Sequence, residues 1–254
     1  MNVNMKETKT QFLTPLQIAM TAINATLYAT MGIVTYFGIF APPPIGVVRF
    51  WPVVVIPGVF AALFGPWVGG IGAAIGIFAS DMFVHGNALL SVTVGVPSNF
   101  LCFYLVGYIA RKEISLRKLA PILAIGFLIL VGGIYSIVAY LPETFEFTGL
   151  STTNSILLFL AAVGGSYALI IIIASLWPEW KSYGVASVIG LSVGSAIIGL
   201  GLVAYLNTPS YFSLLWFIWT FTTEAPFLLL LGPPILKACY RAFPSIEPPR
   251  KRSR

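Results

Sequence analysis

Long apolar segments occupy most of this chain and constrain its fold more than any other feature of the sequence. Eight can be distinguished, each bounded by proline, glycine or polar residues. They run approximately over residues 15–40, 51–65, 66–84, 92–110, 119–141, 154–177, 183–207 and 211–236. A helix needs about 20 apolar residues to cross the hydrocarbon core of a bilayer. The sequence therefore predicts an all-α, polytopic transmembrane helix bundle with six to eight spans.

The shortage of charged residues excludes a soluble fold for the bulk of the chain. Only 9% of the 254 residues are charged, whereas a soluble domain carries about 25%. So few charges could not cover a chain that is 58% apolar, and the lipid bilayer is the expected solvent. We expect a polar N-terminal segment at 1–14, a single integral membrane domain at 15–240 and a basic tail at 241–254.

The basic residues predict the direction in which the helices run. Eight spans that begin with the N-terminus inside place thirteen of the fourteen Lys and Arg residues on one side, all except Arg49. The acidic loop with Glu143 and Glu146 then falls on the other side. Cytoplasmic loops are enriched in Lys and Arg, so we expect a multi-pass protein of the cell membrane with both termini in the cytoplasm. This topology explains the net charge of +6 without a nucleic-acid partner.

The region 51–84 leaves two alternatives open. Pro52, Pro57 and Pro66 interrupt it, so it could form two short helices or a re-entrant hairpin. Both return the chain to the same side of the membrane, and loop charges cannot separate them. One continuous helix would reverse every later loop, which the basic loops argue against.

Catalytic and nucleotide-binding motifs are missing from the sequence. It has no P-loop, no zinc-binding His-Glu-x-x-His motif and no Gly-x-Ser-x-Gly nucleophile motif. Asp81 is the only aspartate and His85 the only histidine. We therefore expect no metal site, no cofactor and no ATP hydrolysis by this chain, and a binding or transport role is favoured over an enzyme.

A carboxylate in the last apolar segment is the first candidate functional residue, because ionisable groups within a membrane are costly. Glu224 lies 13 residues from both Tyr211 and Lys237, about 20 Å from either end of a helix. Together with Thr223 it forms a polar node just before Pro226. The carboxyl group could contact a ligand or gate its passage, or, either protonated or bonded to a neighbouring helix, it could hold the bundle together.

Further polar residues fall toward the outer side of the predicted bundle. Asp81 could contact a ligand, or fix a loop by pairing with His85 or Arg49. Arg49 beside Trp51 could cap an outward-facing pocket and bind an anion, unless its aromatic neighbours form an interfacial belt. Asn99 lies about two helical turns below the outer surface and needs a polar partner, either a helix or a solute. Their shared side suggests a pocket loaded from outside.

Three stretches of the sequence carry a resemblance to a known family. They are residues 22–29 (AINATLYA), 57–66 (PGVFAALFGP) with the Gly/Ala-rich run to Asp81, and 93–101 (TVGVPSNFL). They resemble the S components of energy-coupling factor transporters, the substrate-binding proteins of vitamin uptake, and the run from Pro226 to Lys237 is similar to the family's last helix. The family typically has six helices, so the resemblance implies that about 119–177 is an insertion.

The resemblance implies a division of labour between this chain and its partners. S components bind a vitamin or related micronutrient from outside and dock on a transmembrane coupling protein that works with two cytoplasmic ATPases. In the family an Ala-x-x-x-Ala strip on the first helix contacts the coupling protein, and Ala25 and Ala29 match it here. The candidate substrate-binding residues are Arg49, Trp51, Asp81, His85, Asn99, Thr223 and Glu224.

Two other functions stay open on the sequence alone. A stand-alone, proton-coupled secondary transporter could use Glu224 as its proton site. A structural subunit of a larger membrane complex would tolerate substitutions at Glu224 and Asn99. It would not tolerate them on helix faces with glycines four residues apart, where helices pack closely.

Overall fold

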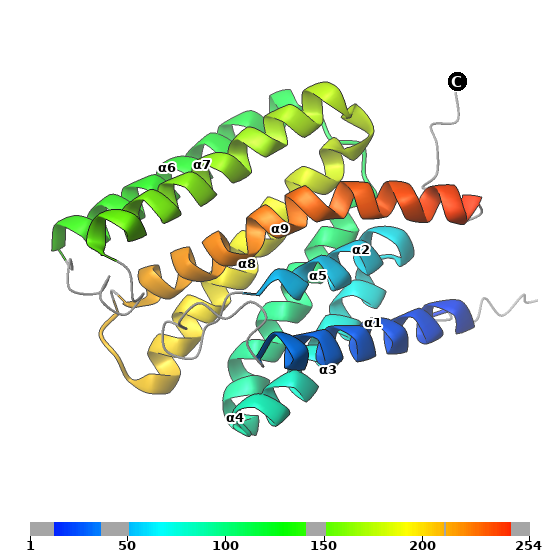
Figure 1. Ribbon diagram of the computed structural model, residues 1–254, viewed down its shortest axis with the longest axis horizontal. Coiled ribbons are helices and arrows are strands. Elements are labelled where there is room, and N and C mark those ends of the chain that lie inside the picture. The colour runs from blue at the N-terminus through cyan, green and yellow to red at the C-terminus, as the bar shows by residue number, and fades with distance from the viewer. Residues whose placement is uncertain (1–12, 37–50, 141–150, 211, 245–254) are drawn as a thin grey trace, which may run out of the picture.

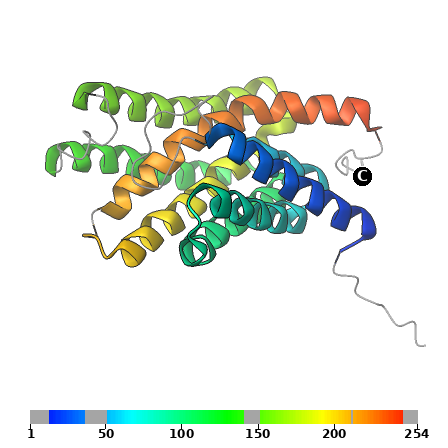
Figure 2. The ribbon, with the colours of Figure 1, turned by 60° about the horizontal axis from the view of Figure 1, so that its bottom comes forward.

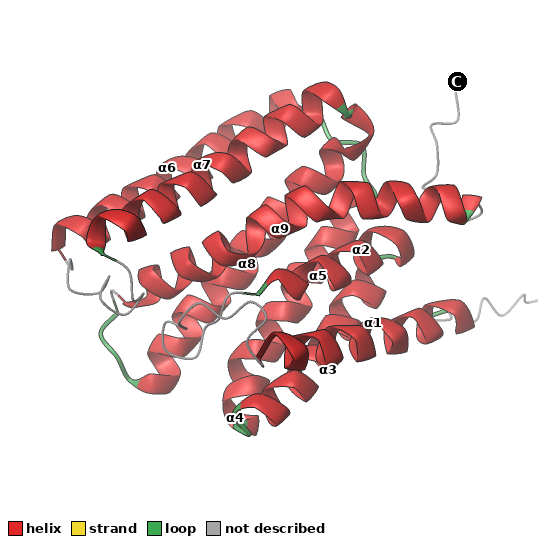
Figure 3. Cartoon of the chain, in the orientation of Figure 1, coloured by secondary structure: helices red, strands yellow, loops and turns green. Residues whose placement is uncertain are grey.

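The apolar segments fold into a bundle of helices (Figures 1 and 3). The computed structural model describes residues 13–36, 51–140, 151–210 and 212–244. Within these ranges all regular structure is helical, which confirms the predicted fold class. Seven helical segments in the described ranges are long and apolar enough to cross a membrane, and an eighth, Pro52–Phe64, is shorter.

The helices follow the eight predicted segments. They are α1 (Pro15–Val34), α2 (Val55–Phe64), α3 (Pro66–Val84), α4 (Ala88–Leu90), α5 (Val96–Ala110), α6 (Leu116–Tyr140), α7 (Thr152–Leu176), α8 (Lys181–Leu206) and α9 (Phe212–Ala242). Short 3-10 turns precede α2 (Pro52–Val54) and α8 (Pro178–Trp180). A π-helical turn, Ser91–Gly95, joins α4 to α5 so that the three form one span.

Local sequence signals explain where these helices begin and end. The Thr14 side chain accepts a hydrogen bond from the Gln17 N–H, and the Gln17 side chain accepts one from the Thr14 N–H, which together cap α1. Pro15 and Pro66 occupy first helical positions, where the missing N–H costs no hydrogen bond. Helix α8 ends at Asn207, which adopts the left-handed conformation (φ 52°).

The region 51–84 forms two helices of unequal length. They separate at Gly65, whose φ of 109° is costly for other residues. Helix α2 has ten residues and α3 has nineteen, which correspond to lengths of about 15 Å and about 28 Å. Only α3 can therefore cross a bilayer, and α2 fills one half of the bundle.

The alternating directions of the helices give the bundle two distinct ends. Helix α1 begins and α9 ends at the same end, here named the terminal end (Figure 1). The opposite, or far, end holds the turn between α3 and α4. The described basic residues lie toward the terminal end: Arg111, Lys112, Arg117, Lys118, Lys181, Lys237 and Arg241. The basic residues of the described ranges therefore share one side of the bundle.

Helix α2 lies at the centre of the packing. Helices α1, α3, α5, α8 and α9 pack against one another in that order, and α2 contacts α1, α3, α5 and α9. Between α1 and α9 an apolar groove of about 530 Å³ reaches the surface of α2. The inner helices thus surround α2 on all sides except along this groove.

Helices α6 and α7 form an antiparallel hairpin at the edge of the bundle. In Figures 1 and 2 this green pair runs alongside α9, on the side away from α1 and α3. The hairpin packs on α8 and α9. The described part of the segment 119–177, which the family resemblance marks as surplus, therefore lies at the edge of the bundle, outside the packing of α1, α2, α3 and α5.

Glycines allow the inner helices to approach closely, as their spacing predicts. A Cβ atom at Gly69 of α3 would overlap Ala61 of α2 and would lie 2.9 Å from the Phe103 carbonyl oxygen of α5. A Cβ atom at Gly76 would lie 2.9 Å from the Ala25 carbonyl oxygen of α1. The α1–α3 contact also holds a buried hydrogen bond, in which the Asn24 amide donates to the Val68 carbonyl (3.0 Å).

Replacing Gly69 by alanine is expected to destabilise the protein, because the added carbon meets backbone atoms of α5 that cannot move alone. Such overpacking costs about 1–3 kcal/mol, so the midpoint of thermal unfolding in detergent should fall by several degrees. The control is Gly164→Ala in α7, where a Cβ atom has no neighbour within 4 Å. Equal midpoints for the two variants would contradict the close packing of α3 described above.

Candidate functional site

A cavity of about 100 Å³ opens among the helices beyond the N-terminal end of α2. Because α2 fills only the half of the bundle nearer the terminal end, room is left between the surrounding helices in the other half. The residues that line the cavity are Tyr28, Trp51, Ile77, Asp81, His85, Leu90, Val94, Gly95, Asn99, Ile198, Leu202 and Glu224. They come from α1, α3, α4, α5, α8, α9 and the turns between them.

Five of the seven candidate binding residues named from the sequence line this single cavity: Trp51, Asp81, His85, Asn99 and Glu224. Of the other two, Thr223 does not line the cavity. Thr223 is buried, and its hydroxyl donates to the carbonyls of Trp219 and Thr220 in its own helix. Arg49 lies outside the described residues.

One wall of the cavity is a chain of hydrogen bonds that joins three segments. The Trp51 Nε1–H donates to the Tyr28 hydroxyl (2.8 Å), and that hydroxyl donates to Asn99 Oδ1 (2.7 Å). Asn99 Nδ2 in turn donates to the Gly95 carbonyl (3.0 Å). The Tyr28 and Trp51 rings meet edge to face, with centroids 6.2 Å apart. Trp51, only 8% exposed, is therefore a wall of the cavity and not part of an interfacial belt.

Tyr28 holds this wall together, and the sequence analysis did not identify it as a site residue. Its side chain is 1% exposed, and its hydroxyl is the shared atom of two of the hydrogen bonds. The available signal was its position in the 22–29 stretch, one helical turn after Asn24. An aromatic residue in an apolar helix carries no pattern that separates a site residue from a packing residue.

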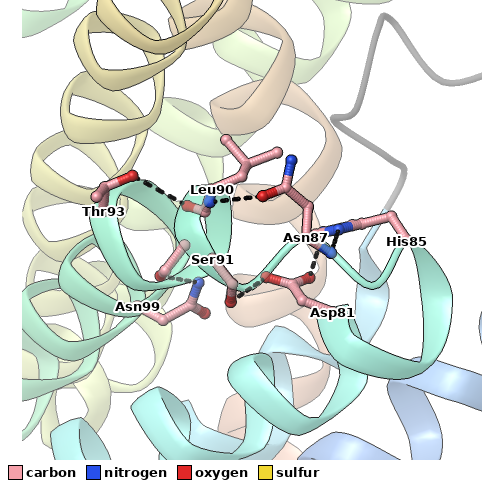
Figure 4. Close-up of polar contacts among 8 residues, drawn as sticks. Asp81, His85, Asn87, Leu90, Ser91, Thr93 and Asn99 are labelled. Carbon is pink, nitrogen blue, oxygen red and sulfur yellow. Dashed lines mark hydrogen bonds and ion pairs between the residues drawn. The ribbon is translucent and has the colours of Figure 1, made fainter.

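A second cluster of polar residues lies around Asp81 at the far end of α3 (Figure 4). Its Oδ2 accepts a hydrogen bond from the Ser91 hydroxyl (2.7 Å), and its Oδ1 lies 3.5 Å from His85 Nε2. His85 Nδ1 accepts a hydrogen bond from the Asn87 N–H (3.1 Å), which assigns the proton of a neutral imidazole to Nε2. Asp81 thus pairs with His85, one of its two expected partners, and also lines the cavity.

Glu224 faces the cavity from α9. Among the described residues, no hydrogen bond or ion pair reaches its carboxyl group, so the interhelical bond considered above is not observed there. Pro226 lacks an N–H, which leaves the Thr222 carbonyl without its usual helical donor. Near Glu224, helix α9 therefore has a backbone carbonyl that lacks its helical hydrogen bond beside a carboxyl group without a described partner.

The two alanines that match the family's docking strip differ in their exposure. Ala25 is 6% exposed and lies against Gly76 of α3, whereas Ala29 is partly exposed. The neighbouring positions Ala22, Ile23 and Thr26 are exposed on α1. A partner would reach these exposed positions before Ala25, and the docking role of the alanines stays a prediction.

The lining of the cavity combines a few polar groups with a larger apolar part. Carboxylate, amide and hydroxyl groups occupy one part, and Ile77, Leu90, Val94, Ile198 and Leu202 form the rest. A few polar groups within a largely apolar wall are typical of small-molecule sites. In the described part of the chain, no group of three or more His, Cys, Asp or Glu side chains could hold a metal ion.

Comparison with models of known protein families, with curated proteins and with solved structures finds no match to this chain. The resemblance to S components therefore rests on the quoted sequence motifs alone.

Replacing Tyr28 by phenylalanine is expected to weaken both the wall and the fold. The ring remains, but the buried Trp51 N–H loses its acceptor, and an unpaired buried group costs about 1–3 kcal/mol. The unfolding midpoint in detergent should fall measurably. Tyr108→Phe is the control, because Tyr108 is 47% exposed on the surface of α5 and keeps the ring over which Lys112 lies. A Tyr28→Phe protein as stable as this control would contradict the role given to the hydroxyl.

Proposed function

We propose that this chain is the membrane-embedded substrate-capture subunit, an S component, of an ATP-driven importer of the energy-coupling factor type. The observation that carries the proposal is the convergence of Trp51, Asp81, Asn99 and Glu224 on one cavity in the half of the bundle beyond α2. The substrate would be a vitamin or a related micronutrient, as the family resemblance implies.

The packing around α2 supports capture from one side. Beyond the cavity, toward the terminal end, Ala61 of α2 is fully buried and lies against Gly69 of α3 and Gly107 of α5. A solute that enters from the far end therefore stops at the level of Trp51. Passage to the other side needs a rearrangement of these helices, and a subunit that only captures its substrate leaves that work to a partner.

The missing nucleotide-binding motif supports a division of labour. The sequence contains no P-loop, so energy from ATP would come from two cytoplasmic ATPases through a transmembrane coupling protein. In the proposed topology the chain spans the cell membrane with both termini in the cytoplasm, because the basic residues lie toward the terminal end. The cavity half of the bundle then faces outward, where a micronutrient is captured.

The first test asks whether the chain holds a small molecule. We expect the purified protein to retain one solute that mass spectrometry identifies. Glu224→Gln should lower its retention about tenfold or more, since a hydrogen bond to a charged group contributes about 1.5–3 kcal/mol. Asn99→Ala should lower it less, since a bond between neutral groups contributes about 0.5–1.5 kcal/mol. Glu179→Gln, an exposed carboxylate in the Pro178–Trp180 turn, is the matched control and should retain the solute.

Uptake of that solute by cells distinguishes the alternatives. The proposal predicts that uptake stops when the catalytic sites of the partner ATPases are inactivated. Uptake that persists without ATPases and collapses with a protonophore would identify a proton-coupled secondary transporter instead. A chain that retains no solute, and whose complex tolerates both substitutions, would be a structural subunit.

Cysteine labelling tests the proposed orientation. The two native cysteines, Cys102 and Cys239, are free and are replaced by alanine. Single cysteines are then introduced at Ser210 and Glu179, exposed positions that flank the two ends of α8. In intact cells a membrane-impermeant maleimide should label Ser210→Cys but not Glu179→Cys, which should react only after the cells are opened. The reverse pattern would place the termini outside.

A further inference from the structure

Among the described residues that line the cavity, the charged side chains are mostly acidic. Asp81 approaches it from α3 and Glu224 from α9. Among the described residues that line the cavity there is no lysine or arginine, and His85 is the only base. His85 lies 3.5 Å from Asp81, so any positive charge that it carries is directed at that carboxylate and not at Glu224.

The hydrogen-bond donors of the wall are already used by one another. The Trp51 N–H is bonded to Tyr28, and the Tyr28 O–H is bonded to Asn99. Around Asp81, the Ser91 hydroxyl is bonded to the carboxylate and the Nε2–H of His85 faces it. One amide hydrogen of Asn99 is donated to the Gly95 carbonyl, and the other is free to bond a solute. The wall therefore offers a solute almost no free donor.

Acceptors, in contrast, remain available. An ionised carboxylate has about four acceptor positions on its two oxygens, and no described residue donates to those of Glu224. An ionised carboxylate in surroundings of low polarity is strongly destabilised unless a cation or several donors accompany it, and without them the group takes up a proton. A cation bound beside it therefore stabilises its ionised form. A solute that complements these described residues brings donors for their free acceptors and a positive charge for the Glu224 carboxylate.

We propose that the cavity recognises an organic cation in which a protonated amine or heterocyclic nitrogen with at least one N–H is attached to an apolar body. Glu224 is the counter-ion of the charged nitrogen. The remaining Asn99 amide hydrogen bonds a polar atom of the body, and Ile77, Leu90 and Ile198 contact its apolar part. This inference rests on the proposed capture function and adds the chemical class of the substrate.

Three probes of nearly equal size and different charge test the inference: benzylammonium, benzyl alcohol and benzoate. Their binding is measured by isothermal titration calorimetry on the full chain in lipid nanodiscs. Benzylammonium should bind at least about tenfold more tightly than the other two, the effect of one charged hydrogen bond. Glu224→Gln should remove that preference, because it keeps the shape of the side chain and removes its charge.

Two further variants separate recognition from misfolding. Asp81→Asn should reduce benzylammonium binding less than Glu224→Gln does, since Asp81 is already bonded by Ser91 and paired with His85. Glu179→Gln at the terminal end should bind like the unaltered chain. Unfolding midpoints measured alongside show whether each variant is folded, and a folded Glu224→Gln protein with unchanged benzylammonium binding overturns the inference.

The remaining outcomes keep this inference and the proposed function apart. Tighter binding of benzoate, or no binding of any probe, overturns recognition of cations. A neutral or anionic solute that copurifies, and whose uptake requires the ATPases, also overturns it while the importer function stands. A copurified cation whose uptake requires no ATPase supports the inference and overturns the importer.

Discussion

The half-length of α2 is the constraint on which the rest of the architecture depends. Helix α2 begins only at Val55, after the Pro52–Val54 turn, and ends ten residues later at the terminal end of the bundle, whereas its neighbours continue past its N-terminal end. A full-length helix in the same position would fill the space now lined by Tyr28, Asn99 and Glu224. The close contact between Gly69 and Ala61 fixes α2 against α3, so the level at which the cavity begins is set by backbone packing and not by mobile side chains.

The cavity shows two different solutions to the cost of polar groups in a bilayer. The Trp51–Tyr28–Asn99 chain satisfies its own hydrogen bonds, which makes it stable without a solute. Glu224 obtains no such help from the described residues. Buried polar networks that are complete stabilise one conformation, whereas incomplete ones are costly. Among the described residues, Glu224 is therefore the polar group of the cavity whose cost is not met by hydrogen bonds within the bundle.

The sequence predicted the spans well, because hydropathy and the punctuation by proline and glycine are strong signals. It also placed Trp51, Asp81, His85, Asn99 and Glu224 on one side, since span order fixes the depth of each residue. It grouped Thr223 with Glu224, but consecutive helical residues differ by about 100° in direction, and the Thr223 hydroxyl returns to its own helix. Spacing alone could not tell that Ala25 packs against Gly76 within the bundle.

The π-helical turn Ser91–Gly95 makes the lining of the cavity sensitive to chain length. A π turn holds one residue more than an α turn, so it shifts the phase of everything that follows in α5, including Asn99. Loss of one residue from this turn would restore a regular helix and rotate Asn99 by about 100°, while the apolar character of the span would hardly change. A single-residue insertion or deletion in this turn, which hydropathy does not register, would therefore change which side chains line the cavity while the span itself is kept.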